Sequence, residues 1–207
     1  MITAVIFDFF GVVGQSTYQL VVSDMTLSSE QKLQLSDLHK SMDNGFVNDT
    51  EFLQQYAQIL NMDYAEFVQK YYESEHRFQN SAAILSLIAQ LREHHAVGLL
   101  SNVGADGYAK FIEPIANNFD VVVTSFQVGL AKPERAIFEY MADQLQVDAS
   151  ECIMIDDSET NCEGARAAGM EAIRYDNYLQ LMQKISQFIN IKKKKKDSIV
   201  CKIRQWI

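Results

Sequence analysis

The sequence predicts an α/β protein, built as a doubly wound parallel sheet with an inserted helical subdomain. Two observations predict this class. Short, continuous apolar runs alternate with helical stretches in the second half of the chain, and a segment of almost 90 residues between the first two runs contains no good strand. Continuous apolar runs of this length are typical of strands buried on both faces of a parallel sheet.

The apolar runs are expected to form the strands of the sheet. They lie at residues 4–8, 96–100, 121–124, 152–155 and 172–174. Helical stretches separate the later runs, at residues 82–94, 105–117, 134–145 and 158–168. Because strand–helix–strand connections are right-handed, this alternation predicts helices on both faces of one sheet. Pro133 is expected in the first turn of the helix that follows it.

Residues 15–80 are predicted to be helical. Ser28 and Asn48 each begin a capping box, and Asp63 begins an Asp-led variant. We expect this segment to form a cap over the carboxyl edge of the sheet, because open α/β sheets bind ligands at that edge. The predicted organisation is an α/β core at residues 1–14 and 81–190, a helical cap at 15–80 and a basic amphipathic tail at 191–207.

Charge and composition exclude several classes of protein. The net charge is −9, so nucleic-acid binding is not expected, since phosphate backbones would be repelled. No apolar run approaches the ~18 residues that cross a bilayer. Three cysteines without a CxxC pair indicate neither a disulfide framework nor a zinc site. The apolar start contains Asp8 and lacks a basic region and a cleavage site, so we interpret it as a buried strand of a cytoplasmic protein.

Residues 191–207 differ from the acidic remainder of the chain. Lysines occupy positions 192–196, and the apolar residues between Ile199 and Ile207 fall on one helical face. A basic amphipathic segment of this kind can make weak contact with an anionic membrane surface. A solvated tail, or one docked on the protein's own body, is the alternative interpretation.

Polar side chains that could carry chemistry end three of the predicted strands. Asp8 ends the first, Ser101 and Asn102 end the second, and Asp156 with Asp157 ends the fourth. Because the carboxyl ends of parallel strands meet at one edge of the sheet, we expect these groups to lie together. Taken singly, each is also explained as ordinary turn or helix-capping chemistry. The two adjacent carboxylates repel each other, and a hard divalent cation such as Mg²⁺ relieves that repulsion.

Lys132 adds a cation to this set. It stands just before a predicted helix, where the helix macrodipole disfavours positive charge. A nearby anion is one explanation of its place, and a solvated surface lysine is the other. A carboxylate nucleophile, a metal site, an ammonium and a hydroxyl together suit phosphoryl transfer. The combination therefore predicts a phosphoryl-transfer site at this edge of the sheet.

Four segments carry a family resemblance: VIFDFFGVV, LLSN, GLAKPERAIF and IMIDDSETNCEGARAAGM. In this order and spacing they make residues 1–190 resemble the haloacid dehalogenase-like hydrolase superfamily, in the branch with a helical cap after the first strand. The resemblance implies a Rossmann-like core, Mg²⁺ as cofactor and an aspartyl-phosphate intermediate on Asp8.

The resemblance also implies roles for the other site residues. Ser101 and Lys132 would bind the phosphoryl group, with Asn102 beside them. The implied metal ligands are the carboxylates of Asp8, Asp156 and Asp157 and the backbone carbonyl of Phe10.

The chain departs from the family at Phe10. In family phosphatases the residue two positions after the nucleophile is normally a second Asp, the general acid–base, whereas a phenylalanine ring can neither give nor take a proton. Loss of a positioned acid–base costs ~10²–10⁴ in rate. Three consequences stay open. The substrate has a good leaving group such as an anomeric or acyl phosphate, a cap residue such as His39 or His76 supplies the proton, or catalysis is largely lost.

We therefore predict a Mg²⁺-dependent phosphatase of small phosphorylated metabolites, sugar phosphates included, whose partners are small phosphate esters and not nucleic acid. A metal-independent 2-haloacid dehalogenase is the first alternative, because the dehalogenases of the family also have an aromatic residue at the position of Phe10. They do not show an acidic pair in the last motif, so Asp156 and Asp157 favour the phosphatase. A catalytically weakened binding protein is the second alternative, for which Phe10 is the reason.

Overall fold

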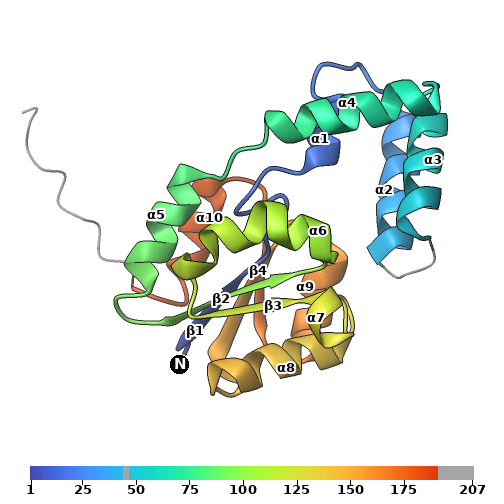
Figure 1. Ribbon diagram of the computed structural model, residues 1–207. Coiled ribbons are helices and arrows are strands. Elements are labelled where there is room, and N and C mark those ends of the chain that lie inside the picture. Colours follow the sequence, from blue (N-terminus) through green and yellow to red (C-terminus); the bar gives the residue numbers. More distant parts are fainter. Residues whose placement is uncertain (44–46, 191–207) are drawn as a thin grey trace, which may run out of the picture.

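The computed structural model describes residues 1–43 and 47–190, and it confirms the predicted α/β class. Its centre is a five-stranded parallel sheet with the strand order β3-β2-β1-β4-β5 (Figure 1). The strands are β1 Ala4–Phe7, β2 Ala96–Ser101, β3 Val121–Thr124, β4 Cys152–Asp156 and β5 Glu171–Arg174. Each apolar run expected to form a strand does so, within a residue of its expected bounds.

The strand order places β1 at the centre of the sheet, hydrogen bonded on both sides. Ala4 pairs with Ala96 of β2 and with Cys152 of β4. Because all the strand pairs are parallel, the carboxyl ends of the strands share one edge of the sheet. Asp8 follows β1 directly at this edge, and Ser101 and Asp156 are the last residues of β2 and β4.

Helices cover both faces of the sheet (Figure 1). α5 Ala82–Leu91 and α10 Tyr178–Ile185 contribute to one hydrophobic core, and α8 Arg135–Leu145 and α9 Glu159–Ala167 contribute to the other. The side chains of β1 alternate between these two cores. Val5 and Phe7 belong to the first core and Ile6 to the second, and all three are fully buried. The unbroken apolar character of β1 therefore follows from burial on both faces.

In the described part of the chain, four helices are inserted between β1 and α5, and we refer to them as the inserted helices. They are α1 Thr17–Val22, α2 Ser29–Asp43, α3 Asp49–Ile59 and α4 Tyr64–His76. The predicted caps are present: the Asn48 side chain accepts from the Glu51 N–H, and the Asp63 carboxylate accepts from the Ala65 N–H. The inserted helices have a core of their own, which includes the buried rings of Phe52 and Phe67.

Two linkers join the inserted helices to the sheet, and they run side by side. The Ser81 N–H donates to the Val13 carbonyl at 2.8 Å, and the Gln15 N–H donates to the Gln79 carbonyl at 3.2 Å. Residues 9–14 separate Asp8 from the first linker, residues 15–16, and these hydrogen bonds hold the second linker, residues 77–81, beside it. The inserted helices are therefore attached directly beside the loop that follows Asp8 (Figure 1).

Two details of the predicted helices differ in the structure, and two of the described helices were not predicted. Residues 105–117 are not one helix but α6 Ala105–Gly107, a π-helix Tyr108–Ile112 and a 3₁₀-helix Glu113–Asn118. Pro114 lacks an amide hydrogen, so regular α-helical bonding cannot continue through it. Pro133 precedes α8 instead of lying in its first turn, because the N-cap residue Glu134 still has extended backbone angles. The short α7 Ser125–Val128 and the amphipathic α10 were not expected from the sequence.

None of the helices in residues 1–43 and 47–190 is long and apolar enough to cross a membrane. The basic segment 191–207 lies outside the described residues. Its weak contact with an anionic membrane surface therefore stays a prediction.

Candidate active site

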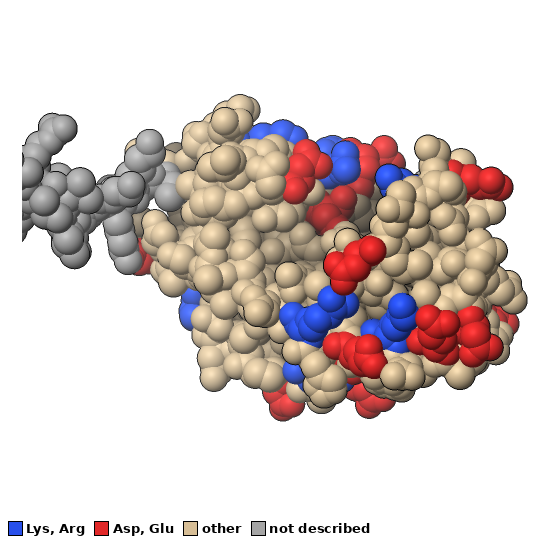
Figure 2. Space-filling model, turned by 90° about the horizontal axis from the view of Figure 1, so that it is seen from above, with Lys and Arg blue, Asp and Glu red and all other residues tan. Residues whose placement is uncertain are grey.

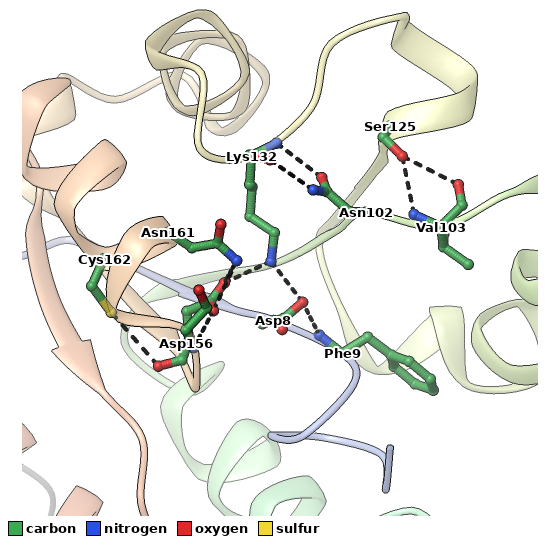
Figure 3. Close-up of polar contacts among 10 residues, drawn as sticks. Asp8, Phe9, Asn102, Val103, Ser125, Lys132, Asp156, Asn161 and Cys162 are labelled. Atoms are coloured by element: carbon green, nitrogen blue, oxygen red, sulfur yellow. Dashed lines mark hydrogen bonds and ion pairs between the residues drawn. The ribbon is translucent and has the colours of Figure 1, made fainter. Parts of the chain in front are cut away.

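Lys132 lies between two carboxylates at the carboxyl edge of the sheet (Figure 3). Its Nζ is 2.7 Å from Asp8 Oδ1 and 2.6 Å from Asp156 Oδ2. The Lys132 side chain is 1% exposed, so these are buried, hydrogen-bonded ion pairs and not surface contacts. Of the two explanations that the sequence leaves open for Lys132, the nearby anion is the correct one.

Asn102 holds the backbone on which Lys132 stands. Its Nδ2 donates to the Lys132 carbonyl at 2.8 Å, and its Oδ1 accepts from the Lys132 N–H at 2.9 Å (Figure 3). These two hydrogen bonds connect the residue after β2 to the loop before α8. This gives Asn102 a positioning role, and a direct contact between Asn102 and a substrate stays a prediction.

The carboxylate of Asp156 is fully buried and surrounded by donors. Besides Lys132, it accepts from the Ser158 N–H at 2.9 Å and from Asn161 Nδ2 at 3.1 and 3.2 Å. Sequence reasoning did not single out Asn161, although it stands one turn into the helix that follows the acidic pair, where it faces back to the strand end. The Asp156 carboxylate is thus held in place by Lys132, the Ser158 N–H and Asn161.

Asp157 lies against the loop that follows Asp8. A Cβ on Gly11 would stand 2.2 Å from Asp157 Oδ2, and Gly11 has φ +87°. Only glycine permits both the backbone angle and this close approach. Asp8, Asp156 and Asp157 each offer an oxygen, and these oxygens all lie within 4.8 Å of one another. The three carboxylates predicted from the sequence are therefore brought together.

The charges of this cluster do not balance. Among the residues that the structure describes, three carboxylates lie together, and Lys132 is the one ammonium paired with two of them, Asp8 and Asp156. Burial raises the pKa of Asp8 well above its usual value, Lys132 opposes that shift, and the carboxylates of Asp156 and Asp157 add to it. Burial by itself lowers the pKa of Lys132, but Asp156 and Asp8 outweigh it and hold that pKa above its usual value. Hard oxygen ligands with excess negative charge suit a divalent cation such as Mg²⁺.

Ser101 completes the edge with a buried hydroxyl. The residue is 0% exposed, and its Oγ has no hydrogen-bond partner among the described residues. A buried hydroxyl without a partner costs free energy, so such groups are usually explained by a ligand or an ion. The Ser101 Oγ is thus free to bind a ligand at this edge of the sheet.

The two histidines considered as substitute proton donors do not contact Asp8. His39 lies within the inserted helices, where its ring centroid is 5.5 Å from Tyr18, 5.1 Å from Phe52 and 5.7 Å from Tyr56. Burial lowers its pKa to about 4. His76 is exposed at the end of α4. Within the described residues, the hydrogen bonds and ion pairs of the Asp8 side chain go to the Phe9 N–H and Lys132.

The geometry is matched by a sequence profile. The profile described as haloacid dehalogenase-like hydrolase matches residues 5–175, from β1 to the residue after β5. The chain belongs to this hydrolase family. The matched region contains every site residue discussed above, so the resemblance to the hydrolase superfamily is confirmed, whereas the helical-cap branch stays a prediction.

The relatives of this family member include proteins named phosphatases. Phosphatase MT3486 of Mycobacterium tuberculosis is 29% identical over 122 residues, which are 58% of this chain and 52% of the relative. The D-ribitol-5-phosphate phosphatase of Bacteroides thetaiotaomicron is 23% identical over 208 residues, which cover 92% of this chain and 100% of the relative. The chain spans about half the length of the mycobacterial relative and 15% of another, the bifunctional epoxide hydrolase 2 of Mus musculus.

A solved structure shares the fold. The HAD-hydrolase YfnB of Bacillus subtilis, whose structure was determined with bound magnesium, is 18% identical with a TM-score of 0.65. The superposition covers 92% of this chain and 99% of YfnB. At this identity the similarity establishes a common architecture, a parallel sheet flanked by helices.

Proposed function

We propose that the protein is a Mg²⁺-dependent phosphatase of small phosphorylated metabolites that acts through an aspartyl phosphate on Asp8. The observation that carries the proposal is the arrangement of Lys132 between Asp8 and Asp156, with Asp157 beside them and the Ser101 hydroxyl without a partner. Asp8 would be the nucleophile, and Lys132 and Ser101 would bind the oxygens of a phosphoryl group. These groups and the carboxylates of a cation site lie together at one edge of the sheet.

Asp8 is oriented for attack by its own neighbours. Its Oδ1 accepts from the Phe9 N–H at 2.7 Å and pairs with Lys132 at 2.7 Å. These contacts fix the carboxylate and leave Oδ2 to approach phosphorus in line. Lys132 and the Ser101 hydroxyl would bind oxygens of the transferring phosphoryl group, where negative charge must be stabilised.

The metal ligands are assigned from the donor set. We assign the Mg²⁺ site to Asp8, Asp157 and the backbone carbonyl of Phe10, while Asp156 is committed to Lys132, Asn161 and the Ser158 N–H. Direct binding by Asp156, as the sequence suggests, is the alternative within the same site. When bound, the cation neutralises phosphoryl oxygens and offsets the excess of carboxylates.

The inserted helices are proposed to act as a cap that selects the substrate. Figure 2 shows the surface hollowed between the inserted helices and the core, with acidic side chains inside the hollow. A substrate bound there would contact both parts, and closure would exclude water from the aspartyl phosphate. Sugar phosphates are included among the candidate substrates, because a relative that this chain matches along its full length is named D-ribitol-5-phosphate phosphatase.

The direct test is hydrolysis of 4-nitrophenyl phosphate with and without Mg²⁺. We expect metal-dependent turnover that is lost in Asp8→Asn and kept in Asp143→Asn, a matched change at an exposed position of α8. Turnover by Asp8→Asn at the wild-type rate would contradict the mechanism. Addition of Mg²⁺ should also raise the melting temperature of the wild type and not that of Asp157→Asn, since a ligand stabilises only the state that binds it.

The dehalogenase alternative rests on Phe10 and makes a different prediction. Its nucleophilic Asp8 would attack carbon, without a metal. Release of halide from a 2-haloacid in the presence of a chelator would favour it over the phosphatase. Binding of phosphate without any turnover would instead favour the second alternative, a binding protein that keeps the fold.

A further inference from the structure

Hydrogen bonds continue from Lys132 beyond the site, to the edge strand of the sheet. Asn102 bonds the Lys132 backbone, and the next residue, Val103, is bonded in turn by Ser125. The Val103 N–H donates to Ser125 Oγ at 3.0 Å, and Ser125 Oγ donates to the Val103 carbonyl at 3.3 Å (Figure 3). A hydroxyl can do both, because it carries one proton and two lone pairs. The residue after β3 is thus linked to Lys132 through the loop after β2.

The Ser125 hydroxyl binds the chain where the sheet no longer holds it. The last paired residues of β2 and β3 are Ser101 and Thr124. Val103 lies beyond this pair, so its N–H and carbonyl need partners outside the ladder of the sheet. Ser125, the first residue of α7, is a partner for each of them. Its side chain therefore continues the contact between the two segments past the ends of the strands.

Ser125 itself stands on a well-anchored turn. The preceding residue, Thr124, is fully buried, and its Oγ1 donates to Gln127 Oε1 at 2.7 Å. Gly129 ends α7 with φ +69°, a left-handed conformation that glycine adopts without strain. The place of the Ser125 hydroxyl is therefore set by β3 and α7, and not by the loop that it binds.

Asn102 lies between two points of attachment. On one side is the ladder pair of Ser101 with Thr124, and on the other are the bonds from Ser125 to the residue after Asn102. The Asn102 amide meets both the N–H and the carbonyl of Lys132, at 2.9 and 2.8 Å. Hydrogen bonds weaken steeply when their geometry changes, so movement of this loop would weaken both contacts with Lys132.

We propose, building on the phosphatase function above, that Ser125 is a positioning residue of the site. It holds Val103, and through Asn102 it fixes the backbone of Lys132. That backbone sets the place from which Lys132 Nζ pairs with Asp8 at 2.7 Å. Lys132 would bind oxygens of the transferring phosphoryl group, and displacement of such a group by about 1 Å lowers the rate by ~100-fold.

The test is the kinetics of Ser125 variants with 4-nitrophenyl phosphate and Mg²⁺. Contacts that are strongest in the transition state affect kcat more than KM. We therefore expect Ser125→Ala to lower kcat by ~10- to 100-fold while KM stays within about 3-fold of the wild type. Ser125→Thr keeps the hydroxyl and should restore kcat, and an equal loss in both variants would count against the hydroxyl.

Ser186→Ala is the matched control, since the exposed Ser186 hydroxyl also bonds a backbone group, the Gln183 carbonyl at 2.8 Å. Its kcat should equal that of the wild type. An unchanged kcat in Ser125→Ala would overturn the proposal and leave the phosphatase function intact.

A double variant tests whether Ser125 acts through Asn102. Groups that act as a unit have non-additive effects, so loss of the Ser125 hydroxyl should matter little once Asn102 is replaced. We expect the kcat of Asn102→Ala with Ser125→Ala to lie within about 3-fold of that of Asn102→Ala alone. A double variant whose loss is the product of the two single losses would contradict this route.

Hydrogen exchange separates the positioning role from the function itself, because it needs no substrate. The Lys132 N–H donates to Asn102 Oδ1, so its exchange reports whether Asn102 is in place. Exchange followed by NMR should be ~3- to 10-fold faster in Ser125→Ala, the factor of one hydrogen bond, and unchanged in Ser186→Ala. Equal exchange in the wild type and Ser125→Ala would refute the positioning role. The expected exchange in a wild type that hydrolyses no phosphate ester would refute the phosphatase function alone.

Discussion

Replacing Lys132 with methionine tests whether the buried ion pairs organise the site. The change keeps the length of the side chain and removes the only ammonium within reach of Asp8 and Asp156 in the described residues, at 2.7 and 2.6 Å. Both contacts are buried, so the carboxylates cannot be rehydrated fully. Removing one partner of such a pair costs ~3–5 kcal/mol, because an uncompensated charge stays buried.

The measurement is the free energy of unfolding from urea titrations at pH 7 in the absence of divalent cations. Arg135→Met is the matched control, since Arg135 pairs with Glu139 at 2.7 Å on the surface, with side chains 66% and 47% exposed. An exposed pair of this kind contributes ~0–1 kcal/mol. If Lys132→Met lowers the free energy of unfolding by no more than Arg135→Met does, Lys132 is not the counter-charge of the buried carboxylates.

The pH dependence of the same variant has a definite sign. Burial raises the pKa of Asp8, with Asp156 and Asp157 adding to the shift, and removal of Lys132 raises it further. A carboxyl group whose folded pKa lies above its unfolded value takes up protons on folding, so stability increases as pH falls towards the unfolded pKa. The difference in the free energy of unfolding between the wild type and Lys132→Met should therefore become smaller from pH 7 to pH 5. A difference that does not change with pH would contradict this account.

Three further predictions follow from individual contacts. Gly11→Ala should weaken Mg²⁺ binding by ~10-fold or more in calorimetric titrations, because its Cβ would stand 2.2 Å from Asp157 Oδ2; unchanged affinity would exclude Asp157 as a ligand. Burial lowers the pKa of His39 to about 4, so between pH 6.5 and 4 the unfolded state binds more protons than the folded state. The free energy of unfolding should therefore decrease by up to ~3 kcal/mol as the pH is lowered through this range. His39→Leu should remove this pH dependence of the free energy of unfolding, measured in urea titrations at several pH values. An equal pH dependence in the wild type and the variant would contradict the buried, neutral His39. Lys110→Met breaks the ion pair with Glu75, which joins the π-helix to α4, and should speed hydrogen exchange in α4 by up to ~10-fold, whereas Lys70→Met within α4 should not.

The sequence by itself predicted the strands, most of the helices and which residues could group at one edge of the sheet. Strands such as β1 and β4 were predictable because burial on both faces leaves an unbroken apolar run. The cap at Asn48 was predictable because its hydrogen bonds join residues three apart. Asp8, Ser101 and Asp156 could be grouped without coordinates, since parallel strands bring their carboxyl ends to one edge.

Only the tertiary structure decided which groups meet at that edge. That Lys132 is buried between Asp8 and Asp156, and that Asn102 holds its backbone, depends on the packing of a loop against two strands distant in the chain. The different surroundings of Asp156 and Asp157 could not be read from two adjacent identical residues. Their burial and partners are set by neighbours from other segments, Asn161 for the first and Gly11 for the second.

The same reason applies to Phe10. The sequence shows that the residue two positions after Asp8 is a phenylalanine, which cannot donate or accept a proton. It does not show where the ring lies. Phe111, which packs against it, lies in a π-helix that the sequence predicted only as a helical stretch, and Phe78, which packs against Phe111, comes from the second linker. Patterns in a sequence report local hydrogen bonding and which side of an element is buried, whereas contacts between remote side chains exist only once the sheet, the linkers and the inserted helices have packed together.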